Sequence, residues 1–296
     1  MKHLLTATLL LLIAPAWNES RQLRVNVDLV NVLFNVTDQN GRLVSGLTRD
    51  DFTVHEDEKK QEIHRFSHDN ELPLTVGLLI DASASVNTVF ADEKETAIQF
   101  LEATLQSGDL AFVIGFDNSV TLLEDFSDDL RRLRSAIRSL TIGQGTAVYD
   151  AVYLACKEML EQEAGRKALI LISDGQDTVS KVRLNDAVVA AYNSEAVIYS
   201  ISNRIGGFFN LPGTGNPETL KQFSSATGGT VFFVGGRSDL TRVFERISQE
   251  LRTQYSLAYT STNTTRDGKY RRIRIVPRNP THRVKSRSGY YAPTGD

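Results

Sequence analysis

The hydrophobic pattern of the chain changes twice along its length. Between Gln22 and Ser67, apolar residues alternate with polar ones, which is typical of β-strands. The alternation moves from odd to even positions at Val30, so we expect a bulge there or a strand that passes between two sheets. From Leu74 to about Arg252, short apolar runs alternate with amphipathic stretches, and after Arg252 the β-type pattern returns.

The middle part predicts an α/β fold. Its apolar runs have the length and continuity of parallel strands that are covered on both faces. They are LTVGLLI, DLAFVIGF, KALILIS, AVIYSIS and TVFFVG. Amphipathic helices are expected between them, and DNSVTLLEDF is expected to add an antiparallel hairpin at one edge. This alternation predicts a doubly wound, mostly parallel sheet flanked by helices.

The two β-type parts are each too short to bury a core alone. We therefore expect them to pair in a small β-sandwich-like subdomain into which the α/β domain is inserted, with two separate flanking hairpins as the alternative. Charge supports the pairing, because residues 252–296 contain ten Lys or Arg and two Asp, whereas the remaining chain is acidic. The expected parts are an N-terminal β segment (20–71), the α/β domain (72–252) and a C-terminal β segment (253–296).

The N-terminus has the pattern of a secretory signal peptide, expected over residues 1–19. Lys2 precedes an apolar stretch, residues 4–13, that ends in the small-residue sequence APA. We expect cleavage near Ala16, with an uncleaved N-terminal anchor as the alternative. The apolar stretch is short for a membrane span, and the sequence contains no other candidate, so a secreted or periplasmic protein is predicted.

Composition narrows the partners and the chemistry. With 296 residues, 41% of them hydrophobic, and a net charge of −3, the chain gives no global reason to expect nucleic acid or an anionic membrane as partner. The single cysteine, Cys156, excludes an intrachain disulfide. It shares a helical face with Val148, Val152 and Met159, so we expect a core residue and not a nucleophile.

Three polar loops are expected at the carboxyl ends of the parallel strands, where open α/β sheets bind their ligands. Asp81, Ser83 and Ser85 follow the run LTVGLLI with D-x-S-x-S spacing. Thr146 lies in GQGT before a predicted helix, and Asp174 follows the run KALILIS. Two carboxylates with three hydroxyls suit a hard divalent cation such as Mg²⁺, which binds oxygen and keeps several waters.

Several of these polar residues also fit simpler structural roles. Helix N-capping explains one residue of the sequence DASAS, but neither Thr146 nor Asp174. Asp150 and Asp177 could approach these loops, but they are expected to be solvated carboxylates at a helix start and in a loop. Asp117 and the asparagine after it are expected to form a hairpin turn. The histidines show no spacing typical of a zinc site.

The three segments together resemble the von Willebrand factor type A domain, whose metal-ion-dependent adhesion site combines D-x-S-x-S with a separate threonine and a separate aspartate. The resemblance implies that Ser83 and Ser85 bind the metal directly and that Thr146 joins them when ligand is bound. Asp81 and Asp174 would act largely through water. The implied metal is Mg²⁺, with Mn²⁺ or Ca²⁺ as alternatives, and an Asp or Glu carboxylate of a partner protein would complete its coordination.

The resemblance favours a non-enzymatic adhesion module, and the flanking sequences LTRDDFTVHEDEKKQEI and SRSGYYAP are similar to those of a bacterial secreted family related to this domain. One alternative is a phosphatase-like, metal-dependent hydrolase that uses Asp81. Such enzymes need a second aspartate two residues later, where this chain has Ser83. Another alternative is an accessory subunit of a larger assembly, against which the predicted signal peptide argues.

Overall fold

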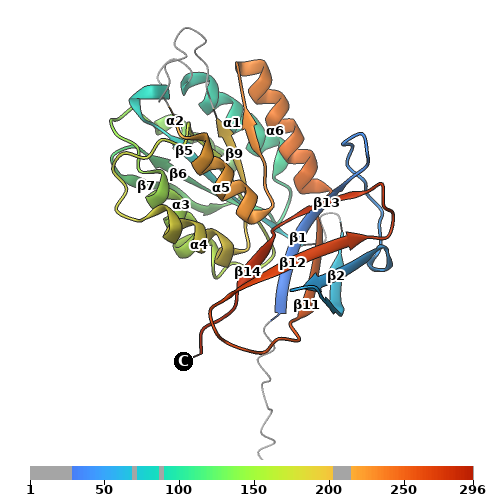
Figure 1. The fold of residues 1–296 in the computed structure, drawn as a ribbon. Coiled ribbons are helices and arrows are strands. Elements are labelled where there is room, and N and C mark those ends of the chain that lie inside the picture. The colour runs from blue at the N-terminus through green and yellow to red at the C-terminus, as the bar shows by residue number, and fades with distance from the viewer. Residues whose placement is uncertain (1–28, 69–71, 87–89, 203–214, 296) are drawn as a thin grey trace, which may run out of the picture.

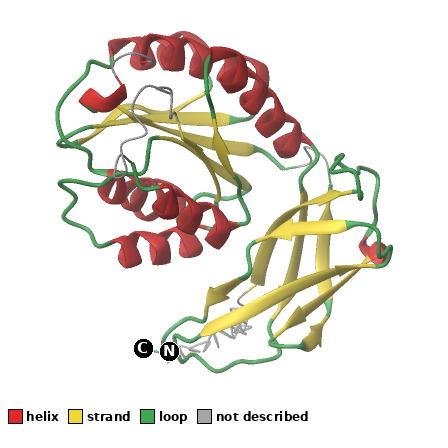
Figure 2. Ribbon diagram, turned by 45° about the horizontal axis from the view of Figure 1, so that its top comes forward, coloured by secondary structure: helices red, strands yellow, loops and turns green. Residues whose placement is uncertain are grey.

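The computed structural model describes residues 29–68, 72–86, 90–202 and 215–295, which form an α/β part and an all-β part (Figure 1). The two parts lie side by side, and helices cover the α/β sheet on both faces, as Figure 2 shows. The expected signal peptide lies outside the described residues. In the described ranges, no helix combines the length and the apolar character needed to cross a membrane.

A six-stranded sheet forms the centre of the α/β part. Its strands are β5 (Leu74–Asp81), β6 (Leu110–Phe116), β7 (Val120–Ser127), β8 (Arg166–Ile172), β9 (Val197–Ser202) and β10 (Val231–Phe233). They are arranged in the order β10-β9-β8-β5-β6-β7. All neighbouring pairs are parallel except β6 and β7, which are antiparallel at one edge. The predicted mostly parallel sheet with an antiparallel edge hairpin is confirmed.

Helices cover both faces of this sheet because its strands are apolar on both faces. The helices are α1 (Phe90–Thr104), α2 (Leu130–Ser139), α3 (Val148–Leu154), which a π-helical segment (Ala155–Leu160) continues, α4 (Leu184–Ser194), α5 (Pro217–Thr227) and α6 (Arg237–Arg252). Side chains of α1, α2 and α6 pack on one face against Val76 and Leu78. Those of α3, α4 and α5 pack on the other face against Leu79. Successive residues of a strand point to opposite faces, so burial of both faces requires the continuous apolar run of β5.

Two four-stranded sheets form the all-β part. Their strands are β1 (Leu29–Thr37), β2 (Phe52–Glu56), β3 (Lys59–Gln61), β4 (Ile63–Ser67), β11 (Tyr255–Thr260), β12 (Tyr270–Pro277), β13 (Arg283–Ser286) and β14 (Gly289–Tyr291). The strand orders are β13-β1-β11-β4 and β14-β12-β2-β3. Strands from before and after the α/β part pair antiparallel in both sheets, as β1 does with β11 and β2 with β12. The domain bounds expected from the sequence stay a prediction.

An aromatic cluster lies between these two sheets. Phe34 of β1 and Phe52 of β2 meet edge to face, with ring centroids 5.0 Å apart. Tyr255 of β11 stacks on Phe34 at 5.3 Å, and Phe66 of β4 stacks on Phe52 at 5.8 Å. The alternating pattern at even positions of β1 therefore marks the side chains that enter this core.

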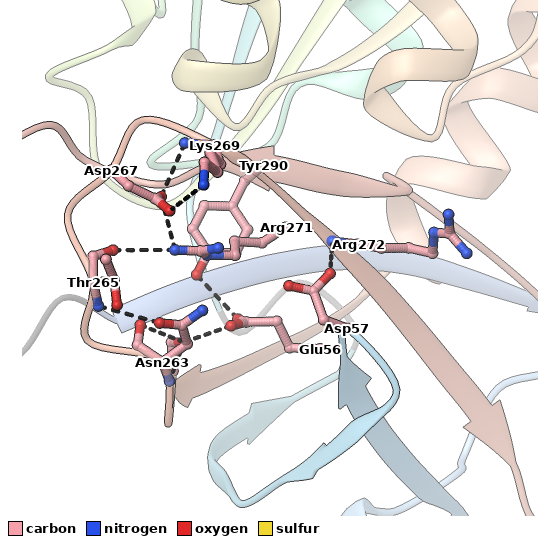
Figure 3. A network of polar contacts seen from close by, with 10 residues as sticks. Glu56, Asp57, Asn263, Thr265, Asp267, Lys269, Arg271, Arg272 and Tyr290 are labelled. Carbon is pink, nitrogen blue, oxygen red and sulfur yellow. Dashed lines mark hydrogen bonds and ion pairs between the residues drawn. The ribbon is translucent and has the colours of Figure 1, made fainter.

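A buried carboxylate, that of Glu56, links the same two sheets at a second place (Figure 3). Its Oε2 accepts hydrogen bonds from the hydroxyls of Tyr259 (2.9 Å) and Tyr290 (3.0 Å). Its Oε1 accepts a hydrogen bond from Ser261 Oγ at 2.5 Å. Burial raises the pKa of Tyr290 to about 12, so this phenol stays protonated and able to donate at neutral pH.

Candidate metal site

Asp81 ends the central strand β5 and is fully buried. Its Oδ1 accepts a hydrogen bond from the backbone N–H of Ser83 (2.9 Å), and its Oδ2 accepts one from Ser173 Oγ (2.6 Å). Burial raises the pKa of Asp81, and these hydrogen bonds oppose that effect. These donors are neutral, so a cation beside this buried carboxylate would offset much of the cost of its charge.

The two serines follow in a tight turn. Ser83 is buried, and its backbone N–H closes the turn onto the carboxylate two residues earlier. Ser85 lies within a short 3₁₀ turn, η2 (Ala84–Val86). The side chain of Ser85 and the residues directly before α1 lie outside what the structure describes, so both its metal role and the capping alternative stay predictions.

Thr146 lies in the loop between α2 and α3 and is 6% exposed. Its backbone N–H donates to Thr178 Oγ1 (2.8 Å), and its carbonyl accepts from the backbone N–H of Thr178 (2.9 Å). Earlier in the same loop, the N–H of Gly143 donates to the carbonyl of Ala82 at 2.8 Å. The loop is therefore bonded both to the segment of Asp81 and to that of Asp174.

Asp174 lies two residues after the end of β8 and is half-buried. Its Oδ1 accepts a hydrogen bond from the backbone N–H of Gln176 at 2.9 Å. The negative charge of Asp174 also contributes to the raised pKa of Asp81, after the larger effect of burial. Two carboxylates that repel each other at one edge of a sheet favour a cation between them.

The structure thus brings together the three loops that the sequence singles out. They lie at the carboxyl ends of β5 and β8 and in the loop after α2, and interloop hydrogen bonds connect them. Sequence reasoning missed Ser173 and Thr178, which make two of these bonds. The position of Ser173 at the end of a buried strand beside Asp174 was the available signal. Metal binding by the five expected residues stays a prediction.

The donor set fits a hard cation. In the described part of the chain, no three His, Cys, Asp or Glu side chains lie close enough together to hold a metal by themselves. A metal at this edge would therefore depend on hydroxyl oxygens as well as on Asp81 and Asp174. Oxygen-only sites with one or two carboxylates are typical of Mg²⁺, whereas structural zinc sites use Cys and His.

Two other acidic residues near these loops have structural roles. Asp150 accepts hydrogen bonds from the backbone N–H groups of Lys181 (3.0 Å) and Val182 (2.8 Å). Asp177 accepts one from Ser180 Oγ at 2.5 Å. The prediction that both carboxylates are simply solvated is wrong, because they tie the loop after β8 to the start of α3.

Two smaller predictions are confirmed. Asp117 lies in the turn between β6 and β7, where its Oδ1 accepts from the backbone N–H of Ser119 at 3.0 Å. Cys156 lies in the π-helical segment that continues α3 and is fully buried among residues of α3 and α4, and burial raises the pKa of its thiol to about 12.

Residues 76–176 match the family model of the von Willebrand factor type A domain. The matched segment contains all five residues of the predicted metal site. No curated protein matches the sequence.

Solved structures share the fold. The vWF domain of the type V pili tip protein Mfa5 from Porphyromonas gingivalis is 15% identical with a TM-score of 0.50, over 61% of this chain and 95% of that chain. A von Willebrand factor type A protein from Catenulispora acidiphila is 13% identical with a TM-score of 0.52, over 92% of this chain and 76% of that chain. The second similarity extends beyond the α/β part.

A third similar structure is proximal thread matrix protein 1 from the mussel byssus, in a form with a zinc-occupied MIDAS motif. It is 20% identical with a TM-score of 0.52, over 66% of this chain and 49% of that chain. This chain therefore spans about half of the mussel protein. At such identities, the common feature of these proteins is the fold.

Proposed function

This chain contains a von Willebrand factor type A domain, and from this premise we propose that it is an exported, non-enzymatic module that binds a partner protein through a metal ion. The metal would be Mg²⁺, with Mn²⁺ or Ca²⁺ as alternatives. The residues proposed to hold it are Asp81, Ser83, Ser85, Thr146 and Asp174.

The observation that carries the proposal is the environment of Asp81. This carboxylate ends the central strand, is fully buried, and has a hydroxyl and a backbone N–H as hydrogen-bond donors. Asp174 adds a second negative charge nearby. Retaining such a group without a cation would be costly, so the geometry supports a metal at this edge.

The partner is proposed to offer an Asp or Glu carboxylate. Two aspartates balance the charge of a divalent ion but leave coordination positions that water or another oxygen can take. When bound, the ion would attract one anionic oxygen of the partner to an open coordination position, and the protein residues would hold the ion in place. The pilus-tip and byssus proteins of similar fold support a role in attachment.

An enzymatic function has less support. All five histidines of the sequence, at positions 3, 55, 64, 68 and 282, lie outside the α/β domain expected over residues 72–252. The position two residues after Asp81 is Ser83, where a phosphatase of the aspartyl type needs an acid. The expected α/β domain therefore contains no histidine that could act as a general base.

The all-β part is proposed to be one subdomain that carries the α/β domain as an insertion. Its two sheets each combine strands from before residue 72 and after residue 252. Export to the periplasm or the cell exterior is part of the proposal and rests on the predicted signal peptide.

Calorimetric titration with Mg²⁺ tests the metal site. We expect one site in the natural protein and loss of binding in the Asp81→Ala and Ser83→Ala variants. Unaltered Mg²⁺ binding in both variants would disprove the assignment. A screen for phosphatase and esterase activity tests the alternative of a metal-dependent hydrolase. That alternative predicts metal-dependent turnover that Asp81→Asn abolishes.

A further inference from the structure

The segment from Ser173 to Thr178 touches both neighbouring loops of the candidate site. We propose that this segment positions the metal ligands: Ser173 fixes the Asp81 carboxylate, and Thr178 fixes the backbone of Thr146. The inference rests on the proposed metal site, and it assigns roles to two residues that are not themselves metal ligands.

The hydrogen-bond direction at Ser173 follows from its partners. Ser173 is fully buried, and its Oγ accepts a hydrogen bond from the backbone N–H of Gly175 (3.1 Å). The single hydroxyl proton is therefore directed to Asp81 Oδ2, 2.6 Å away. With Oδ1 held by the N–H of Ser83, both carboxylate oxygens have a fixed neighbour, and the plane of the carboxylate is set.

Thr178 acts on the opposite loop. Its Oγ1 accepts the backbone N–H of Thr146, and its own N–H donates to the carbonyl of Thr146. Both backbone groups of Thr146 are thus paired with one residue. This leaves little freedom for the Thr146 backbone to move away from the sheet edge.

The segment is itself anchored through Ser180, which lies two residues beyond its end and binds Asp177 within it. Ser180 Oγ accepts hydrogen bonds from the backbone N–H groups of Tyr149 and Asp150, each at 3.1 Å. Asp177 accepts from the same hydroxyl. Because the segment is held at α3 and also carries Asp174, it can set the spacing of three loops. Removing a positioning hydrogen bond should weaken metal binding without removing a ligand, typically by roughly 10–100-fold.

The test is calorimetric titration of the full chain with Mg²⁺ alone, on three variants. Ser173→Ala and Thr178→Val remove the two hydroxyls, and Thr178→Ser keeps the second. We expect the first two variants to bind Mg²⁺ at least about 10-fold more weakly than the natural protein does. Thr178→Ser should bind Mg²⁺ with an affinity within about 3-fold of that of the natural protein, because its exposed position tolerates the change. Mg²⁺ affinity close to that of the natural protein in either Ser173→Ala or Thr178→Val would overturn the proposal.

A structural control separates positioning from general destabilisation. Thr227 is a buried threonine whose Oγ1 accepts the N–H of Ile198 at the start of β9, at the opposite end of the strands. Thr227→Val should lower the metal-free melting temperature but keep the natural Mg²⁺ affinity. Equal losses of affinity in Thr227→Val and Ser173→Ala would also overturn the proposal. Asp81→Asn separates the proposed metal site from the proposed positioning role. If Asp81→Asn still binds Mg²⁺, the metal site itself is wrong. If Asp81→Asn loses Mg²⁺ binding while Ser173→Ala keeps the natural affinity, only the positioning role is refuted.

Discussion

Asn35 of β1 donates a hydrogen bond from Nδ2 to the backbone carbonyl of Glu250 in α6 over 2.7 Å, and both residues are buried. The first described strand of the all-β part therefore holds the last helix of the α/β part. Lys285 of β13 reaches the carboxylate of the same residue, with Nζ 3.8 Å from Oε2. The two parts are thus joined by specific polar contacts as well as by the chain.

We expect Asn35→Ala to lower the free energy of unfolding by about 1–3 kcal/mol, because it leaves the buried carbonyl of Glu250 without this donor. Urea denaturation measures the change. Asn31→Ala is the matched control on the same strand, since Asn31 is exposed and its hydrogen bond to Glu195 lies in solvent. The control should change the free energy by no more than about 0.5 kcal/mol. Equal effects of the two variants would contradict the role of Asn35.

The sequence predicts the parallel sheet well because strands that are buried on both faces appear in the sequence as short, nearly continuous apolar runs. The run that ends at Asp81 is buried at every position, and Thr75 is its one polar residue before the aspartate. The three polar loops follow from the same logic, since parallel strands deliver their carboxyl ends to one edge. The match to the von Willebrand factor type A domain confirms the resemblance that these motifs indicated.

The connections between the loops are not visible in the sequence. Ser173 and Asp81 are 92 residues apart, and Thr178 and Thr146 are 32 apart, so their hydrogen bonds depend on how helices pack between the strands. Glu56 also could not be paired with Tyr259, 203 residues later, from alternation alone. Periodicity indicates which face of a strand is buried, but not which side chain it meets there.

Cys156 should resist alkylation in the native protein. Burial raises the pKa of its thiol to about 12 from an ordinary value of 9.0, and the thiolate is the reactive form. Iodoacetamide at pH 8 should label the unfolded chain rapidly and the native chain very slowly. The unfolded chain loses the thiol proton at a lower pH than the native chain does. The free energy of unfolding should therefore fall as the pH rises from about 9 toward 12. Native labelling as fast as that of the unfolded chain would show that Cys156 is accessible.

Tyr259→Phe should destabilise the all-β part by about 1.5–3 kcal/mol, because it removes a hydrogen bond to the buried carboxylate of Glu56. Tyr291→Phe is the matched control, since Tyr291 is 37% exposed and lies on β14 of the same part. The control should cost no more than about 0.5 kcal/mol in a urea titration. A decrease of less than about 0.5 kcal/mol in the free energy of unfolding of Tyr259→Phe would contradict the proposed strength of the Glu56 contact.

Asp81→Asn should have opposite effects with and without metal. In EDTA the variant should be at least as stable as the natural protein, because it removes a buried charge whose hydrogen-bond donors are neutral while keeping an oxygen for the N–H of Ser83. At a Mg²⁺ concentration roughly 100 times the dissociation constant, the natural protein should gain about 2.7 kcal/mol, and the variant should gain none. Thermal unfolding in EDTA and in Mg²⁺ measures both effects, with Asp125→Asn as an exposed acidic control outside the three loops that should keep the full Mg²⁺ gain. A Mg²⁺ gain of natural size in Asp81→Asn would mean that the buried carboxylate is retained for a reason other than a metal.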